Sequence, residues 1–109
     1  MNFKIVPTPE FEKELKKLSK KYLSLKGDLL NLLLSLKNDP TTGKALGNEV
    51  YKIRLAITSK NKGKSGGARV ITYVKIVDEA IYLISIYDKS ETDTISDNEI
   101  LRRVKLLNN

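Results

Sequence analysis

Residues 50–57 read Val-Tyr-Lys-Ile-Arg-Leu-Ala-Ile, and this stretch decides the fold. Large apolar side chains occupy every second position from Tyr51 to Leu55, and the positions between them hold Lys52 and Arg54. Because successive side chains of a β-strand point to opposite sides, this period of two predicts a strand with one buried face and one basic face. The rest of the chain must then supply a layer that covers the apolar face.

Two more strands are predicted on the C-terminal side, at residues 68–77 (ARVITYVKIV) and 80–87 (AIYLISIY), joined by a tight turn at Asp78-Glu79. Residues 58–67 (TSKNKGKSGG) separate them from the first strand as a basic loop with three glycines. Consecutive strands usually pair, so we expect three antiparallel neighbours with one face on helices and one more open.

The N-terminal side predicts a short strand at residues 3–6, which Pro7 ends, and then two helices. Thr8 serves as the N-cap of the first helix and Pro9 as its first residue. The second helix begins at Tyr22 or Ser24 and runs to Lys37. Its broad apolar face consists of leucines: Leu25, Leu29, Leu30, Leu32, Leu33, Leu34 and Leu36. A face this broad needs a sheet to pack against, and the two helices form an antiparallel hairpin.

Residues 40–49 are predicted to be loop, and a closing helix capped by Ser96 or Asp97 runs to about Leu107. The element order is therefore β-α-α-β-β-β-α. We predict an α+β fold for residues 1–109 as a single domain. In it a small antiparallel-core sheet packs on the N-terminal helical hairpin, and a C-terminal helix closes the chain.

The composition excludes several classes of function. Among its 109 residues the chain has no cysteine and no histidine, so disulfides and thiolate chemistry are excluded, and the commonest metal ligand and general base are missing. The carboxylates show no metal-binding spacing, and neither a metal nor another cofactor is expected. The N-terminus does not resemble a signal peptide, and the longest apolar stretch, Leu29–Leu36, is far shorter than the roughly 20 residues that span a bilayer. We therefore expect a cytoplasmic protein that does not enter a membrane.

The charge is concentrated in one segment. The chain carries a net +7, and residues 52–75 hold seven basic side chains and no acidic one. These are Lys52, Arg54, Lys60, Lys62, Lys64, Arg69 and Lys75. This concentration indicates a polyanionic partner, either nucleic acid or anionic lipid.

The predicted pairing lets these groups converge on one concave basic surface, together with Lys89 at the end of the last strand. Arg54 and Arg69 suit forked contacts to phosphate, and Gly66 and Gly67 let the loop backbone come close to a phosphate group. Tyr87, beside Lys89, is a candidate for base stacking or proton transfer, whereas Tyr73 fits either the core or RNA contact.

Three local motifs, with the element order, resemble the RelE/ParE superfamily of toxin–antitoxin toxins. Tyr51-Lys52-Ile53-Arg54-Leu55 looks like a strand of RelE. The loop from Ser59 to Arg69, followed by Val-Ile-Thr-Tyr, is similar to that of the RelE-like HigB mRNA interferases, as is the segment Ile84-Ser-Ile-Tyr87-Asp-Lys89-Ser-Glu91. The resemblance covers essentially the whole chain and is closest to the HigB branch.

The resemblance implies a ribosome-dependent endonuclease that cleaves mRNA in the A site by metal-independent attack of a ribose 2′-hydroxyl. A lysine among other cations then acts as the base, and arginines bind the phosphate. The expected catalytic residues are Arg54, Lys62, Lys64, Arg69, Tyr87 and Lys89. The expected RNA-binding residues are Lys52, Lys60, Gly66, Gly67, Tyr73 and Lys75.

The chain departs from the RelE pattern at two positions. Ser90 stands where RelE has an arginine, and Thr94, Ile95 or Ser96 stands where RelE has a catalytic tyrosine. The acid–base role then falls to Tyr87 or to a loop lysine.

Two alternative functions stay open, a ParE-like inhibitor of DNA gyrase and a non-catalytic module that binds RNA or the ribosome. The expected partners are the ribosome with mRNA in its A site and a cognate antitoxin, with a HigA-like helix-turn-helix domain, that forms a hetero-oligomeric complex with this chain.

Overall fold

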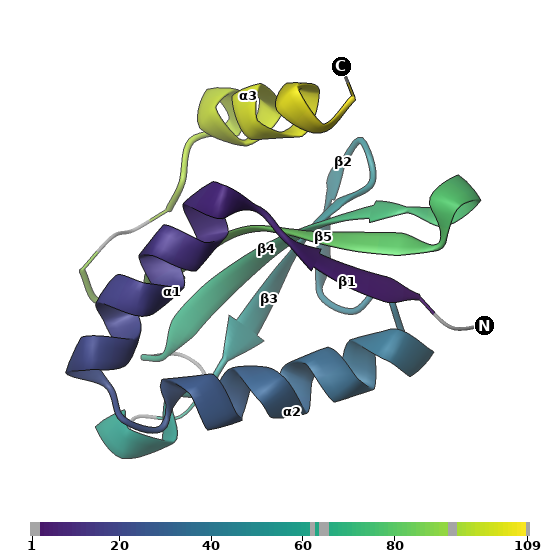
Figure 1. Cartoon of the computed structure of the whole chain (residues 1–109). Coiled ribbons are helices and arrows are strands. Elements are labelled where there is room, and N and C mark those ends of the chain that lie inside the picture. Colours follow the sequence, from purple (N-terminus) through teal and green to yellow (C-terminus); the bar gives the residue numbers. More distant parts are fainter. Residues whose placement is uncertain (1–2, 62, 64–65, 92–93, 109) are drawn as a thin grey trace.

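The fold is described from a computed structural model, which covers residues 3–61, 63, 66–91 and 94–108. Its strands form one five-stranded sheet in the order β1-β5-β4-β3-β2 (Figure 1). The elements are β1 (Lys4–Pro7), α1 (Pro9–Lys21), α2 (Leu25–Asn38), β2 (Lys44–Gly47), β3 (Val50–Leu55), η1 (Thr58–Lys60), β4 (Ala68–Lys75), η2 (Ile76–Asp78), β5 (Ala80–Asp88) and α3 (Asp97–Leu107). The predicted α+β class is confirmed.

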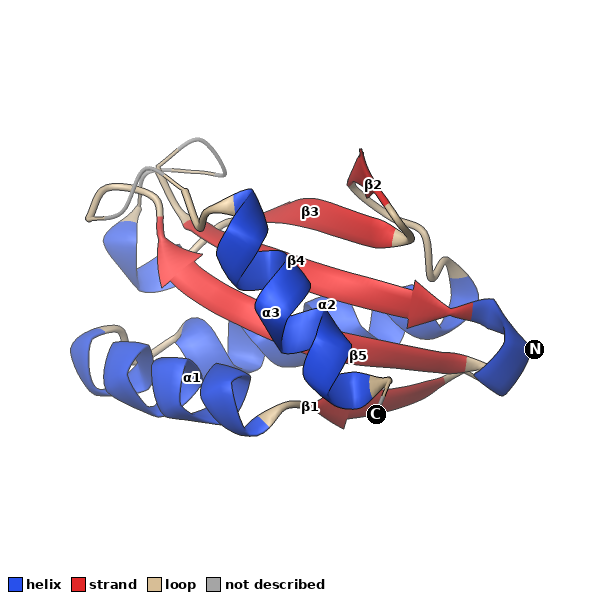
Figure 2. Ribbon diagram, turned by 90° about the horizontal axis from the view of Figure 1, so that it is seen from above, coloured by secondary structure: helices blue, strands red, loops and turns tan. Residues whose placement is uncertain are grey.

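The molecule has three layers. Helices α1 and α2 cover one face of the sheet, and α3 crosses the opposite face over β4 and β5 (Figures 1 and 2). Strands β3, β4 and β5 pair antiparallel in sequence order, as predicted, while β1 lies parallel to β5 at one edge. Strand β3 ends at Leu55, two residues earlier than the sequence pattern indicates, and β5 continues to Asp88.

The main core lies between the sheet and the helical hairpin. Phe11 of α1 and Leu25 and Leu36 of α2 are almost fully buried there. The prediction for the leucine face of α2 is correct only in part, because Leu30 and Leu34 are 58% and 55% exposed. Helix α2 meets the sheet on one side only, so the leucines that broaden its apolar face point toward solvent.

The predicted helix starts are confirmed by their caps. The Thr8 hydroxyl accepts a hydrogen bond from the Phe11 N–H at 3.3 Å and donates one to the Leu83 carbonyl at 2.8 Å. Ser96, one of the two predicted caps of the closing helix, accepts from the Glu99 N–H at 3.1 Å. Each cap satisfies a backbone donor that the first turn of a helix leaves open.

The prediction of loop for residues 40–49 is wrong in one part, because Lys44–Gly47 forms β2 and pairs antiparallel with β3. The hairpin turns at Asn48 and Glu49, which both have positive φ angles of 54° and 66°. Strand β2 is exposed along its whole length. It therefore has no alternation of apolar and polar residues from which a strand could be predicted.

A second, smaller apolar cluster lies between the sheet and α3. It joins Ile71, Tyr73, Ile84 and Tyr87 of the sheet to Ile100 of α3. The face predicted to be open is therefore covered by α3 over part of β4 and β5. No helix in the described ranges is both long and apolar enough to cross a membrane.

Candidate functional site

A row of three residues crosses the sheet at one level. Arg54 of β3 lies directly opposite Arg69 of β4, and Arg69 lies opposite Tyr87 of β5. Side chains at opposed positions of antiparallel strands have Cβ atoms about 5 Å apart, and like charges placed there destabilise a sheet. The register therefore brings two guanidinium groups to the same place on the sheet, where one anion could contact both.

The row opens into a groove of about 750 Å³ along the outer edge of β3, and the paired residues Lys44 of β2 and Lys52 of β3 are part of its lining. Five basic residues line it, and no acidic residue of the described part of the chain does: Lys44, Lys52, Arg54, Arg69 and Lys89. The rest of the lining comes from α2, β3 and the connection after α2: Leu32, Ser35, Thr42, Gly43 and Ile53. A concave surface with charge of one sign concentrates the opposite charge, so the groove is suited to a polyanion.

The groove wall at Gly43 requires glycine. The φ angle of Gly43 is +105°, and a Cβ atom there would lie 2.6 Å from the Lys52 carbonyl oxygen. A side chain would clash with this backbone atom, and the conformation is one that other residues rarely adopt. Gly43 thus lets the connection after α2 lie directly against β3.

The two arginines differ in their surroundings. Arg54 is exposed, whereas Arg69 is 6% exposed and donates a hydrogen bond to the Ala68 carbonyl at 3.1 Å. The register thus sets a buried arginine beside an exposed one, and a guanidinium offers a planar fork of donors that matches two phosphate oxygens.

Lys60 does not line the groove. Its ammonium group lies 2.9 Å from the Asp88 carboxylate and 2.8 Å from the Ser90 hydroxyl, and only 9% of its side chain is exposed. Burial by itself lowers the pKa of Lys60, but the hydrogen bond to Asp88, the charge of Asp88 and the contact with Tyr22 together outweigh this effect, and the pKa is raised. Lys60 is therefore a charged partner of Asp88, and its predicted contact with RNA stays a prediction.

Asp88 is the acidic half of that pair. Its burial alone would raise the pKa, but hydrogen bonds from Tyr22, Lys60 and Ser90 hold the pKa well below its ordinary value. Asp88 ends β5 at a turn, where a carboxylate commonly accepts a hydrogen bond from the backbone two residues further on. The Ser90 N–H does donate to Asp88 at 3.0 Å, but the contacts with Tyr22 and Lys60 depend on the packing of distant segments.

The glycines at the end of the basic loop do not line the groove either. A Cβ atom on Gly67 would lie 2.3 Å from the Leu55 carbonyl oxygen, so this glycine permits close contact between two parts of the protein backbone. Gly66, beside it, is half-buried. The close approach seen at Gly67 is to the end of β3, not to open space where a phosphate could lie.

Tyr73 and Lys75 lie further along β4, and neither lines the groove. Tyr73 is 7% exposed, and its ring centroid lies 6.0 Å from that of Tyr82. Lys75 pairs with Asp78 at 3.3 Å, and the hydrogen bond between them raises the Lys75 pKa. The structure therefore separates these two residues from Arg54 and Arg69.

Tyr87 belongs to the row but lies in the apolar cluster near Ile100 of α3. The residue is 8% exposed, and its buried hydroxyl has no hydrogen-bond partner among the described residues. An unsatisfied buried hydroxyl is costly, so this group gains from any partner that reaches it. Lys62 and Lys64, the predicted catalytic residues of the basic loop, lie outside the described residues.

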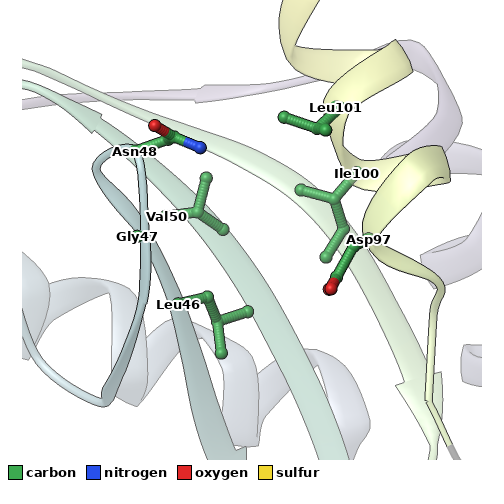
Figure 3. A pocket seen from close by; sticks show the side chains of 7 residues that line it. All are labelled: Leu46, Gly47, Asn48, Val50, Asp97, Ile100 and Leu101. Atoms are coloured by element: carbon green, nitrogen blue, oxygen red, sulfur yellow. The ribbon is translucent and has the colours of Figure 1, made fainter.

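A separate hollow of about 180 Å³ lies between the turn of the β2–β3 hairpin and α3 (Figure 3). Leu46 and Val50 face Ile100 and Leu101 across it, with Asp97 at the side of α3. Its lining has no basic residue, so it does not extend the groove. Within the described ranges no group of three or more His, Cys, Asp or Glu residues is placed to hold a metal ion.

The sequence did not identify Lys44, Thr42 or Gly43 as site residues, although all three line the groove. They lie in the segment predicted to be loop, and β2 brings them to β3. The only sequence signal for these residues is the run Thr41-Thr42-Gly43-Lys44 shortly before the basic strand β3. This run does not indicate a site until the β2–β3 pairing is known.

Comparison with known proteins agrees with this fold. Residues 38–107 match the family described as "RelE toxin of RelE / RelB toxin-antitoxin system". An arginine-to-alanine double mutant of the Escherichia coli toxin RelE, in the free state, is 20% identical with a TM-score of 0.69 over 95% of this chain and 99% of that one. The isolated E. coli RelE toxin is 21% identical with a TM-score of 0.62 over the same shares. The double mutant in complex with a peptide of the antitoxin RelB is 21% identical with a TM-score of 0.52, and the match covers 95% of each chain.

Proposed function

Since this chain belongs to the RelE family of toxins, we propose that it is a ribosome-dependent mRNA endonuclease whose active site is the basic groove. The observation that carries the proposal is the direct opposition of Arg54 and Arg69, with Lys52 and Lys89 beside them in the same groove. Four cations around one hollow fit a phosphodiester that gains negative charge during reaction.

The proposed reaction needs only the RNA and side chains of the groove. A ribose 2′-hydroxyl gives up its proton to a base and attacks the adjacent phosphorus, so that the O2′–P bond forms as the P–O5′ bond breaks. The leaving 5′-oxygen takes up a proton. The products are a 2′,3′-cyclic phosphate and a 5′-hydroxyl end. No metal ion takes part in this scheme.

The roles follow from position. Arg54 and Arg69 bind the non-bridging phosphate oxygens and stabilise the charge that develops in the transition state. Lys52 and Lys89 flank them and are the candidates for the two proton transfers. Tyr87 becomes a third candidate where its hydroxyl reaches the RNA. Lys62 and Lys64 remain predicted contributors.

The groove binds backbone phosphates and has few groups that could distinguish bases, so the ribosome is proposed to present the mRNA. We also propose a cognate antitoxin as partner, with a HigA-like helix-turn-helix domain and an acidic segment that meets the basic face. The E. coli toxin in complex with its antitoxin peptide supports an antitoxin as partner. Co-expression of a candidate antitoxin should restore growth in cells that express this chain.

The test is inducible expression in a bacterial host, followed by mapping of RNA ends. Wild-type protein should generate new 5′-hydroxyl ends inside translated frames, and Arg54→Gln should reduce them at least about 100-fold, the scale of losing one transition-state donor. Lys13→Gln, on the exposed side of α1, is the matched control and should cleave like wild type.

Other outcomes would overturn the proposal. Growth arrest with intact mRNA and DNA damage would indicate a ParE-like gyrase inhibitor. Ribosome binding without new ends would indicate the non-catalytic module. Cleavage by Arg54→Gln at the wild-type rate would show that the groove is not the active site.

A further inference from the structure

The reaction proposed for the groove does not use Asp88, although its carboxylate is completely buried. Asp88 is the last residue of β5 and lies opposite Ala68. Successive strand residues point to opposite faces, so Tyr87 and Lys89 belong to the groove face while Asp88 points toward α1. Burial of this charge below the groove is costly, because a charge loses favourable hydration when it leaves water, so other contacts must compensate.

The Asp88 carboxylate joins three segments that are distant in sequence. It accepts hydrogen bonds from the Tyr22 hydroxyl at 2.6 Å, where α1 ends, and from the Lys60 ammonium at 2.9 Å, where η1 ends. The Ser90 N–H and hydroxyl donate to it at 3.0 and 2.8 Å. The Lys60 ammonium also lies 5.3 Å from the centre of the Tyr22 ring.

The start of the basic loop is held from below as well. Asp28 of α2 accepts from the Thr58 N–H at 2.9 Å and from the Thr58 hydroxyl at 2.6 Å. The Ser24 hydroxyl accepts from the Ser59 N–H at 2.8 Å. Lys60 extends these contacts to Asp88, so the first residues of the loop are tied to both helices of the hairpin.

The end of the loop is held against β3 and β5. The Lys89 N–H donates to the Gly67 carbonyl at 3.0 Å, and Gly67 packs on the Leu55 carbonyl with no room for a Cβ atom. Asp88 is the neighbour of Lys89 in sequence and is opposite Ala68, which precedes Arg69. A shift of Asp88 would therefore move the backbone that carries Arg69 and Lys89.

We propose that Asp88 is a positioning residue of the groove, which holds Arg69 and Lys89 at a fixed separation by tying the end of β5 to Lys60 and Tyr22. The inference rests on the proposed function, since it assigns a role within that site. It also explains why Lys60 does not face the groove: its charge is neutralised by Asp88 below the sheet.

The first test is single-turnover cleavage of mRNA on programmed ribosomes, with increasing toxin concentration. Asp88→Asn should lower the maximal rate about tenfold or more, because a shift of about 1 Å in reacting groups can cost a factor of 100. The concentration for half-maximal rate should stay within about twofold of wild type, since the five basic residues of the groove remain. Glu91→Gln, which removes only the exposed ion pair with Lys21, is the matched control and should leave both values unchanged.

Lys60→Met provides a second variant in case Asp88→Asn does not fold. It keeps an apolar stem and leaves the Tyr22 and Ser90 bonds to Asp88, so it should lower the maximal rate in the same direction by a smaller factor. Unchanged maximal rates in both variants would overturn the proposal. So would losses that appear only as weaker binding.

A readout without cleavage separates this inference from the proposed function. Amide hydrogen exchange of Lys89, whose N–H is bonded to Gly67, should accelerate at least about tenfold in Asp88→Asn and stay unchanged in Glu91→Gln. If wild type cleaves no mRNA but this acceleration occurs, the proposed function fails and the positioning role stands. Unchanged exchange at Lys89 would overturn the positioning role whatever the activity.

Discussion

Asp88 forms a buried ion pair with Lys60, so its ionisation contributes to folding. Replacement by Asn leaves Lys60 buried beside a neutral group, and loss of one partner of a buried ion pair costs about 3 kcal/mol. The folded-state pKa of Asp88 lies below its unfolded value, so its contribution is complete above the unfolded pKa and is lost as the pH falls toward the folded one.

Urea unfolding between pH 3 and pH 7 checks this prediction. The free-energy difference between wild type and Asp88→Asn should be largest near pH 7 and should shrink below about pH 4, the ordinary pKa of Asp. Glu91→Gln should show a small difference throughout. A gap for Asp88→Asn that does not change with pH would contradict the assignment of charge to Asp88.

Gly67 is a second residue whose close packing affects stability near the groove. A methyl group at this position would lie 2.3 Å from the Leu55 carbonyl oxygen and 3.0 Å from the Ala56 Cα atom. Gly67→Ala should therefore lower the free energy of unfolding by about 1–3 kcal/mol, as overpacking does. Gly27→Ala, in α2, should raise it by up to about 1 kcal/mol, because an added Cβ atom would have no atom within 4 Å apart from the adjacent residues and the backbone of its own helix. Urea unfolding measures both free energies, and equal effects of the two substitutions would refute the steric argument.

At the scale of elements, α3 is attached to the rest of the molecule by one side chain in particular. The Arg103 guanidinium donates to the Ile84 carbonyl at 2.9 Å and to the Glu14 carboxylate at 3.1 Å. Glu14 in turn accepts from the Ser85 hydroxyl at 3.0 Å and from the Ile86 N–H at 3.3 Å. These contacts satisfy the edge of β5 beyond the residues that β1 covers, and they join α3 to α1 through charges.

Arg103→Gln should lower the free energy of unfolding by about 2 kcal/mol, the scale of a hydrogen bond to a charged group in a protected place. Loosening of α3 should also expose the apolar cluster beneath it and increase the fluorescence of an apolar dye. Arg102→Gln is the matched comparison, because Arg102 pairs with Glu10 and Glu99 at the exposed surface, where ion pairs contribute little. If Arg102→Gln proved as damaging as Arg103→Gln, the buried contact would not be what holds α3.

At the scale of the whole molecule, the net charge of +7 predicts association with RNA that depends strongly on salt. A plot of log affinity against log salt for a non-cleavable single-stranded RNA should fall with a slope of about 0.7 for each phosphate contact. Arg54→Gln should reduce that slope by about 0.7, whereas Lys13→Gln should not change it. A slope that ignores Arg54 would indicate that the RNA binds to another face.

The groove is basic although the chain has 13 acidic residues, because several of these residues form ion pairs elsewhere in the molecule. Asp88, Glu14 and Glu99 are engaged with Lys60, Arg102 or Arg103 away from the groove. The hydrogen bonds from Arg102 and Arg103 lower the Glu99 pKa to about 2, so this carboxylate keeps its charge and its partners at any physiological pH. Among the described residues that line the groove, five are basic and none is acidic.

The sequence by itself determined the helices, the three central strands, their order and the face on which Lys52 and Arg54 lie. These features depend on contacts between residues a few positions apart: the period of two in β3, the Thr8 and Ser96 caps, and the density of cations between β3 and β4. Local periodicity and capping are therefore readable before any tertiary contact is known.

Only the tertiary structure decided which cations share the groove. Lys60 looks like Lys52 in the sequence, but the packing of β5 on α1 places Asp88 beside it. Lys44 looks like a loop residue, yet the β2 hairpin brings it to the groove wall. The partner of a charged side chain comes from segments that meet only in the folded chain. The sequence near that side chain therefore does not predict the partner.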